Sequence, residues 1–206
     1  MGCCANRYRD SPDKYSAAEL SMGLADIPLA EYTHALQTLP AQVTLAAYAQ
    51  RFEHYEFGQK LASGEDHLLG QVLAHPLFQR DAGLDTTHLF NFGLLYCAGH
   101  AEAKVDAAFS FYGLNSQEVP YKHKLSGMIS DLLEIAVVIV PAAVDREEPE
   151  VLEEQCRPFM EDIRMFAQQR ALEEGRRERV RVRMQNELKF LFSAKGIREQ
   201  VAGDDG

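Results

Sequence analysis

The fold class is decided by residues 84–99, which read Leu84-Asp85-Thr86-Thr87-His88-Leu89-Phe90-Asn91-Phe92-Gly93-Leu94-Leu95-Tyr96-Cys97-Ala98-Gly99. From Leu89 to Tyr96 the apolar side chains cover a broad part of a helix surface. A loop, 78–87, precedes this helix, and Gly99 opens a short linker after it. The stretch therefore predicts a strongly apolar helix between two breaks in the chain.

Helical spacing recurs on both sides of this helix. Apolar residues three or four positions apart form three further stripes: Leu29, Tyr32, Leu36 and Leu39; Leu125, Met128, Ile129, Leu132 and Leu133; Val180, Met184, Leu188 and Leu191. Pro and Gly fall between the stripes, and few long alternating runs occur. The pattern predicts an all-α protein.

Length and composition limit the possibilities further. The 206 residues can hold one domain or two small lobes that share a core. The hydrophobic content of 46% is sufficient for a packed interior. A net charge of −10 argues against nonspecific binding to nucleic acid, and no nucleic-acid partner is expected.

The order of elements over residues 77–133 resembles EF-hand proteins of the neuronal-calcium-sensor and calcineurin B type. The resemblance rests on residues 84–99, on Ala103-Lys104 in the next helix, and on Phe109-Ser110-Phe111-Tyr112 before a twelve-residue loop. It implies EF-hand-like helix–loop–helix pairs in two lobes. We expect a flexible acylated arm at 1–16, lobes at 17–100 and 101–200, and a disordered tail at 201–206. A helical bundle without EF-hand ancestry is the alternative.

The first loop lacks the ligands that calcium requires. A working EF-hand loop has oxygen ligands at positions 1, 3, 5 and 9, Gly at 6 and a bidentate Glu at 12. With Leu84 at the central apolar position 8, positions 1, 3, 5, 6 and 12 become Leu77, Gln79, Asp81, Ala82 and His88. Only Asp81, and Asp85 at position 9, supply carboxylates. We therefore expect no metal at this loop.

The second loop, residues 113–124, is equally unsuited to calcium. Its position 12 is Lys124, whose ammonium repels a divalent cation. Its position 8 is Pro120, which cannot donate the backbone hydrogen bond that pairs two such loops. The interpretation is an EF-hand-like fold that has lost calcium, with no cofactor.

The amino terminus carries a lipidation signal. Gly2 can take a myristoyl chain once Met1 is removed, and Cys3 and Cys4 can take palmitoyl chains. Asn6 stands where the myristoylation motif has Ser or Thr. Two acyl chains give stable attachment, whereas one does not. We therefore expect a lipoprotein on the cytosolic face of a membrane; the alternative is a polar tail and a cytoplasmic protein.

Other membrane and export signals are weak. The first twenty residues lack the apolar region of a secretory signal. The longest apolar run, 132–144, contains Glu134 and Pro141 and is too short to span a bilayer. The lone Cys97 and Cys156 are expected to be reduced core residues.

Partner binding is expected at a hydrophobic groove for an amphipathic helix. Its predicted residues come from two apolar helices: Phe90, Leu94, Leu95, Met128, Ile129, Leu132 and Leu133. Without calcium this groove would stay in one state, so partner binding would be constitutive. The other interpretation is that these residues simply form core.

An arginine-rich segment is a candidate membrane or partner contact, and its residues are Arg176, Arg177, Arg179, Arg181 and Arg183. Interleaved glutamates favour a solvated helix face with local ion pairs instead.

No nucleotide-binding, hydrolase or zinc-protease motif occurs, and no catalytic residues are identified, so the chain is not expected to be an enzyme. The leading hypothesis is a lipid-anchored EF-hand-like adaptor. The alternatives are a calcium sensor with an unrecognised working loop, and a structural helical component of a membrane skeleton or cytoskeletal array.

Overall fold

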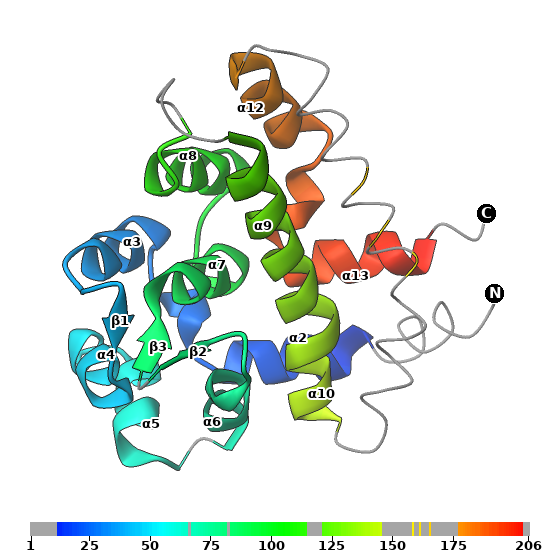
Figure 1. Cartoon of the computed structure of the whole chain (residues 1–206). Coiled ribbons are helices and arrows are strands. Elements are labelled where there is room, and N and C mark those ends of the chain that lie inside the picture. The colour runs from blue at the N-terminus through cyan, green and yellow to red at the C-terminus, as the bar shows by residue number, and fades with distance from the viewer. Residues whose placement is uncertain are drawn as a thin grey trace.

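A computed structural model describes residues 12–65, 67–81, 83–114, 121–145 and 177–203, together with the single positions 158, 161 and 165. Over these residues the chain is mostly helical with one small sheet, which confirms the predicted all-α class (Figure 1).

The amino-terminal half packs short helices around a small antiparallel sheet. Its elements are, in order, α2 (Pro12–Ser21), η1 (Leu24–Asp26), α3 (Leu29–Gln37), β1 (Gln42–Val43), α4 (Leu45–Arg51), α5 (Glu56–Ser63), α6 (His67–Ala74), β2 (Gln79–Arg80), β3 (Gly83–Asp85) and α7 (Thr86–Tyr96).

The carboxy-terminal half is organised by one long helix. The elements described there are α8 (Ala101–Phe111), α9 (Tyr121–Glu134), the π-helical turn η2 (Ile135–Ile139), α10 (Val140–Val144), α12 (Arg177–Asn186), η3 (Lys189–Phe192) and α13 (Ala194–Gly203).

The sheet joins two segments that are far apart in the sequence. Its strand order is β1-β3-β2, and β3 pairs with both neighbours in antiparallel fashion. Val43 of β1 lies opposite Leu84 of β3. The partner of the 77–88 loop within the described residues is therefore the segment before α4. Residues 115–120 of the second predicted loop lie outside the described residues. Helix α9 begins at Tyr121, so this loop ends earlier than predicted, before Lys124.

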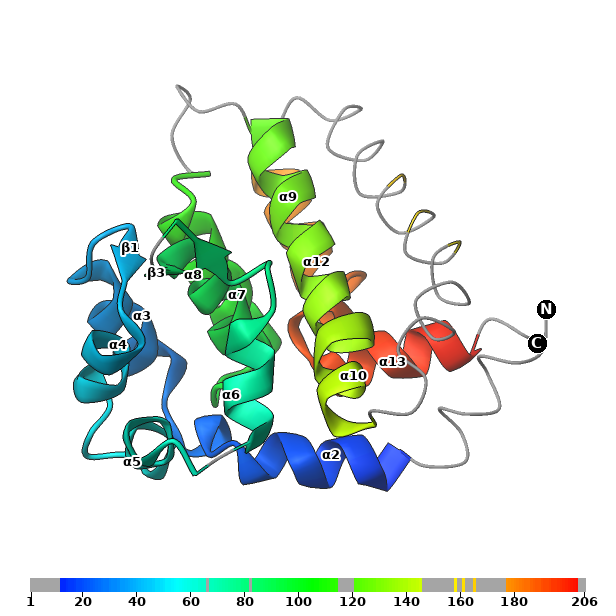
Figure 2. The same ribbon diagram turned by 60° about the horizontal axis from the view of Figure 1, so that its bottom comes forward.

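Helix α7 occupies the centre of the molecule, between α3 on one side and α9 on the other (Figures 1 and 2). All its residues from Leu89 to Tyr96 are buried. The broad apolar surface predicted from the sequence is removed from water because neighbouring elements cover the helix on several sides.

The helical segment α9–η2–α10 contains a π-helical turn next to a proline. Pro141 has no N–H, and the Val140 N–H bonds to the Ile135 carbonyl, five residues back. In this register the Ala136 carbonyl faces Pro141 and needs another donor. The guanidinium of Arg198, on α13, donates to it at 3.3 Å.

Residues His123–Val144 are long and apolar enough to cross a membrane by length and composition alone, unlike the shorter 132–144 run considered by itself. Core helices also meet that test, and 56% of the 18-residue window that passes it is buried inside the chain. Side chains from Leu125 to Val140 contribute to the common core.

One hydrophobic cluster includes buried residues from Tyr15 to Ile197, so both predicted lobes share it. Cys97 is buried, as predicted. The arm predicted at 1–16 was too long, because α2 begins at Pro12, a favourable first helical residue, and Tyr15 packs into the core. The predicted tail also began too early, because α13 continues to Gly203.

Candidate functional site

The seven predicted groove residues lie in the interior rather than on a surface. Their relative exposures range from 0% to 5% for Phe90, Leu94, Leu95, Met128, Ile129, Leu132 and Leu133. Helices α7 and α9 pack against each other, and η3 and α13 also contact α9. The apolar faces are therefore filled by the chain itself, and these residues form no open groove in this conformation.

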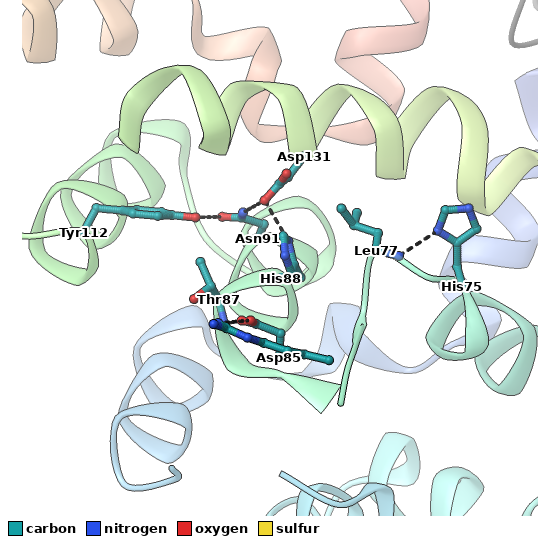
Figure 3. A network of polar contacts seen from close by, with 9 residues as sticks. His75, Leu77, Asp85, Thr87, His88, Asn91, Tyr112 and Asp131 are labelled. Atoms are coloured by element: carbon teal, nitrogen blue, oxygen red, sulfur yellow. Dashed lines mark hydrogen bonds and ion pairs between the residues drawn. The ribbon is translucent and has the colours of Figure 1, made fainter. Parts of the chain in front are cut away.

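A chain of polar side chains connects the end of the 77–88 loop to α8 and α9 (Figure 3). The Tyr112 hydroxyl donates to Asn91 Oδ1, and Asn91 Nδ2 donates to Asp131 Oδ2, each at 2.8 Å. The same Asp131 oxygen lies 2.8 Å from His88 Nδ1. Since Asn91 is fully buried, these bonds replace the water that it loses on folding.

The electrostatics of this cluster favour a charged imidazole. The hydrogen bond to Asp131 raises the pKa of His88, although burial acts in the opposite direction. The carboxylates of Asp85 and Glu134 act in the same direction as Asp131. Asp131 therefore holds the ring of His88 through Nδ1 and stabilises its protonated form.

The carboxylate of Asp85 is occupied by donors from its own loop. The Thr87 N–H donates to Asp85 Oδ1 at 2.8 Å, which caps α7, and Arg80 donates to Asp85 Oδ2 at 3.2 Å. Burial alone would raise the pKa of Asp85, but these hydrogen bonds outweigh it and lower the pKa. A cation at this loop would have to compete with a guanidinium.

The arrangement offers little to a metal or to nucleophilic chemistry. Among the described residues, no group of three His, Cys, Asp or Glu side chains comes together as a ligand set. Within the same residues, the hydrogen-bond partner of the His88 ring is Asp131, and no serine or cysteine takes the place of a nucleophile. The cluster can tie α7, α8 and α9 together.

Sequence reasoning placed His88 at loop position 12 but did not identify Asp131, Asn91 or Tyr112. Asn91 carried a usable signal, because it is a polar residue between Phe90 and Phe92 in a strongly apolar helix, and a buried amide needs partners. Asp131 gave no such signal in the sequence, because an acidic residue beside an apolar stripe is common on a helix.

A second buried polar group is Lys104 of α8. Its ammonium donates to the carbonyls of Leu95, at 3.2 Å, and Phe192, at 3.0 Å. Burial lowers the pKa of Lys104 to about 8. These bonds join α8 to the last turn of α7 and to η3.

Of the predicted lipidation and basic residues, only part can be located. Gly2, Cys3, Cys4 and Arg176 lie outside the described residues, and Arg177 and Arg179 lie in α12. Arg181 pairs with Asp106 of α8 at 2.7 Å, and Arg183 pairs with Glu187 at 3.7 Å. Arg183 thus makes a local pair within α12 and its end, whereas Arg181 pairs across to another helix.

No family model matches this chain, and comparisons with curated proteins and with solved structures give no match either.

Proposed function

We propose that the chain is a lipid-anchored, non-enzymatic EF-hand-like adaptor that binds a partner helix without calcium. The observation that carries the proposal is the pairing of β1 with β3, which links two helix–loop–helix segments through Val43 and Leu84.

The two linked segments have the same local plan, which supports EF-hand-like ancestry. In each, a paired apolar residue is followed by a capping residue and then by a helix. Thr44 accepts a hydrogen bond from the Ala47 N–H at the start of α4, and Asp85 does the same for Thr87 at the start of α7. Leu84 pairs at the position assigned to the centre of an EF-hand loop. EF-hand-like pairing in a second lobe belongs to the proposal on the resemblance alone.

The contacts of the 77–88 loop support a metal-independent form. In a calcium loop, position 12 bends the exiting helix onto the cation through a bidentate Glu. Here His88 occupies that position and binds Asp131 of α9 instead. This contact holds α7 against α9 without an ion, which supports a conformation that does not need calcium.

The anchor and the partner complete the proposal. Acyl chains on Gly2 and on Cys3 or Cys4 would hold the chain on the cytosolic face of a membrane. The helix α2 begins at Pro12, so these groups precede it by ten residues or fewer. Since the predicted apolar groove is filled by the chain itself, a partner helix has to bind another surface.

The anchor is tested by the distribution of wild type and Gly2→Ala between membrane and cytosol in intact cells. We expect wild type in the membrane fraction and Gly2→Ala in the cytosol. Cys3→Ser/Cys4→Ser, which keeps Gly2, should be only weakly retained because one chain gives marginal binding. Equal distribution of all three proteins would exclude the lipid anchor.

Calcium independence is tested by calorimetry and by the melting temperature of the purified chain with calcium and with chelator. We expect no binding heat and no shift of Tm, because a ligand that binds only the folded state must raise Tm. Binding at micromolar calcium would replace this proposal with the calcium-sensor alternative.

A further inference from the structure

An open apolar groove lies between α4 and α5 and has a volume of about 550 Å³. Leu45, Ala46 and Ala49 line it from α4, and Gly58, Leu61 and Ala62 line it from α5. Leu45 is 44% exposed, although it begins the helix that carries buried Tyr48 and Ala49. In Figure 2 the two helices lie at the edge of the molecule farthest from α13.

The packing behind the groove fixes its shape. A Cβ on Gly58 would lie 2.0 Å from the Phe52 carbonyl oxygen, so only glycine lets α5 approach the end of α4 this closely. The rings of Tyr48, Phe52 and Phe57 pack edge to face behind the two helices, with centroids 5.4 to 5.7 Å apart. The groove is therefore preformed, which lowers the conformational cost of binding.

The walls of the groove fit a helix better than an extended peptide. Both walls are helices, so they offer an extended peptide no strand edge to pair with. A helix satisfies its own backbone hydrogen bonds. Small side chains at Ala46 and Ala62 leave room for another helix to approach, and Leu45 supplies exposed apolar surface for it.

The charge of the groove selects a basic helix. Glu53, in the turn between α4 and α5, is the one ionisable residue in the lining, and no side chain among the described residues forms an ion pair with it. The other polar lining residues are the neutral Gln50 and Gln59. A lysine or arginine beside the apolar stripe of a partner would therefore meet a carboxylate and no competing cation within the groove.

We propose that the α4–α5 groove binds an amphipathic helix of another protein, with its apolar side chains against Leu45 and the alanines and a lysine or arginine beside Glu53. This inference rests on the proposed adaptor function and names the surface and the chemistry of the partner.

The test uses the full chain and two fluorescent synthetic helices with the same leucine stripe, one flanked by lysine and the other by glutamate. Fluorescence anisotropy at physiological ionic strength measures their binding. We expect the lysine helix to bind wild type, and Leu45→Gln to weaken that binding about tenfold. Leu20→Gln serves as the matched control, because Leu20 is an exposed helical leucine outside the groove lining. Glu53→Lys should shift the preference toward the glutamate helix.

The possible results distinguish a failure of the groove proposal from a failure of the proposed adaptor function. If Leu45→Gln, Ala62→Arg and Glu53→Lys all bind the lysine helix as wild type does, the groove is excluded while the adaptor function stands. If neither helix binds wild type, the groove fails together with the partner-helix part of the function, and membrane attachment is tested separately by Gly2→Ala. Self-association that Leu45→Gln abolishes would assign the groove to a second copy of the chain and overturn the proposed partner. Circular dichroism of each exposed-site variant verifies that it folds.

Discussion

Gly93 lets α7 lie directly against the ring of Tyr32. A Cβ at this position would lie 2.1 Å from Tyr32 Cε1. The Tyr32 hydroxyl donates to the Leu89 carbonyl at 2.7 Å and lies 2.6 Å from the Tyr48 hydroxyl. Because Tyr32 uses its proton on Leu89, Tyr48 must donate to Tyr32. The absence of one side chain thus permits a buried, fully paired contact between α3, α4 and α7.

Gly93→Ala is expected to destabilise the protein by about 2 to 3 kcal/mol, because the fully buried Tyr32 cannot move away without losing these hydrogen bonds. The matched control is Gly127→Ala in α9, where a Cβ meets nothing within 4 Å. That change should stabilise the protein by about 0.5 to 1 kcal/mol. Urea unfolding measures both, and equal effects of the two changes would contradict the role of Gly93.

His88 makes stability depend on pH. Its pKa is raised by Asp131, so protonation favours the folded state. Its contribution should be complete below the ordinary histidine pKa of about 6.5 and should be lost as pH rises through the raised pKa of the folded protein. His88→Gln should therefore lower stability by about 1 kcal/mol at pH 6 and by less at pH 8.

The measurement is the free energy of unfolding of both proteins at the two pH values. His34→Gln is a control, because His34 is an exposed histidine of α3 that takes no part in this cluster. If the difference in free energy of unfolding between wild type and His88→Gln is the same at both pH values, the hydrogen bond of His88 contributes to stability but the charge of its ring does not.

At the scale of the elements, the long apolar helices were predictable and the short elements were not. The stripes around Phe90 and Leu132 predicted α7 and α9 because apolar residues at helical spacing fix a period over several turns. The strands β1, β2 and β3 contain two or three residues each, too few to show an alternating pattern. The π-helical turn also follows no sequence period, although Pro141 marks its place.

Helix α13 is held by a buried ion pair rather than by its apolar face alone. Arg198 pairs with Glu19 of α2, and the two side chains are only 5% and 11% exposed. The same guanidinium donates to the Ala136 carbonyl and lies 5.4 Å from the centre of the Tyr15 ring. One side chain thus ties α13 to α2 and to the π-helical turn.

Arg198→Met should cost about 3 to 5 kcal/mol, because it leaves the Glu19 carboxylate buried without its partner and removes a donor from the turn. Lys195→Met on the same helix breaks the exposed pair with Glu199 and should change stability by less than about 1 kcal/mol. Denaturant unfolding distinguishes them. If the double variant Glu19→Gln/Arg198→Met is no more stable than Arg198→Met alone, an unpaired carboxylate is not the cause of the loss.

At the scale of the whole molecule, the described residues form a single core with tyrosines built into it. Burial raises the pKa of Tyr32, Tyr48, Tyr96 and Tyr112 above the ordinary value of 10. Each of these residues lies on or beside a different helix, so their ionisation reports on the shared core.

We expect alkaline titration of the folded protein to leave these four of its eight tyrosines protonated until the chain unfolds. In denaturant all eight should ionise near pH 10. Tyrosinate absorbance, recorded together with circular dichroism, measures both processes. Reversible ionisation of more than four tyrosines with unchanged helix content would mean that the core admits water.

The sequence by itself determined the all-α class, the apolar helices at the centre and the burial of Cys97, because these follow from residue type and local spacing. Only the tertiary structure decided that the predicted groove residues are interior, that the 77–88 loop pairs with residues 42–43, and that His88 meets Asp131. A helical pattern states which face is apolar, but not what covers it. Val43 pairs with Leu84, and His88 meets Asp131, across forty or more residues, and contacts at that separation leave no local pattern in the chain.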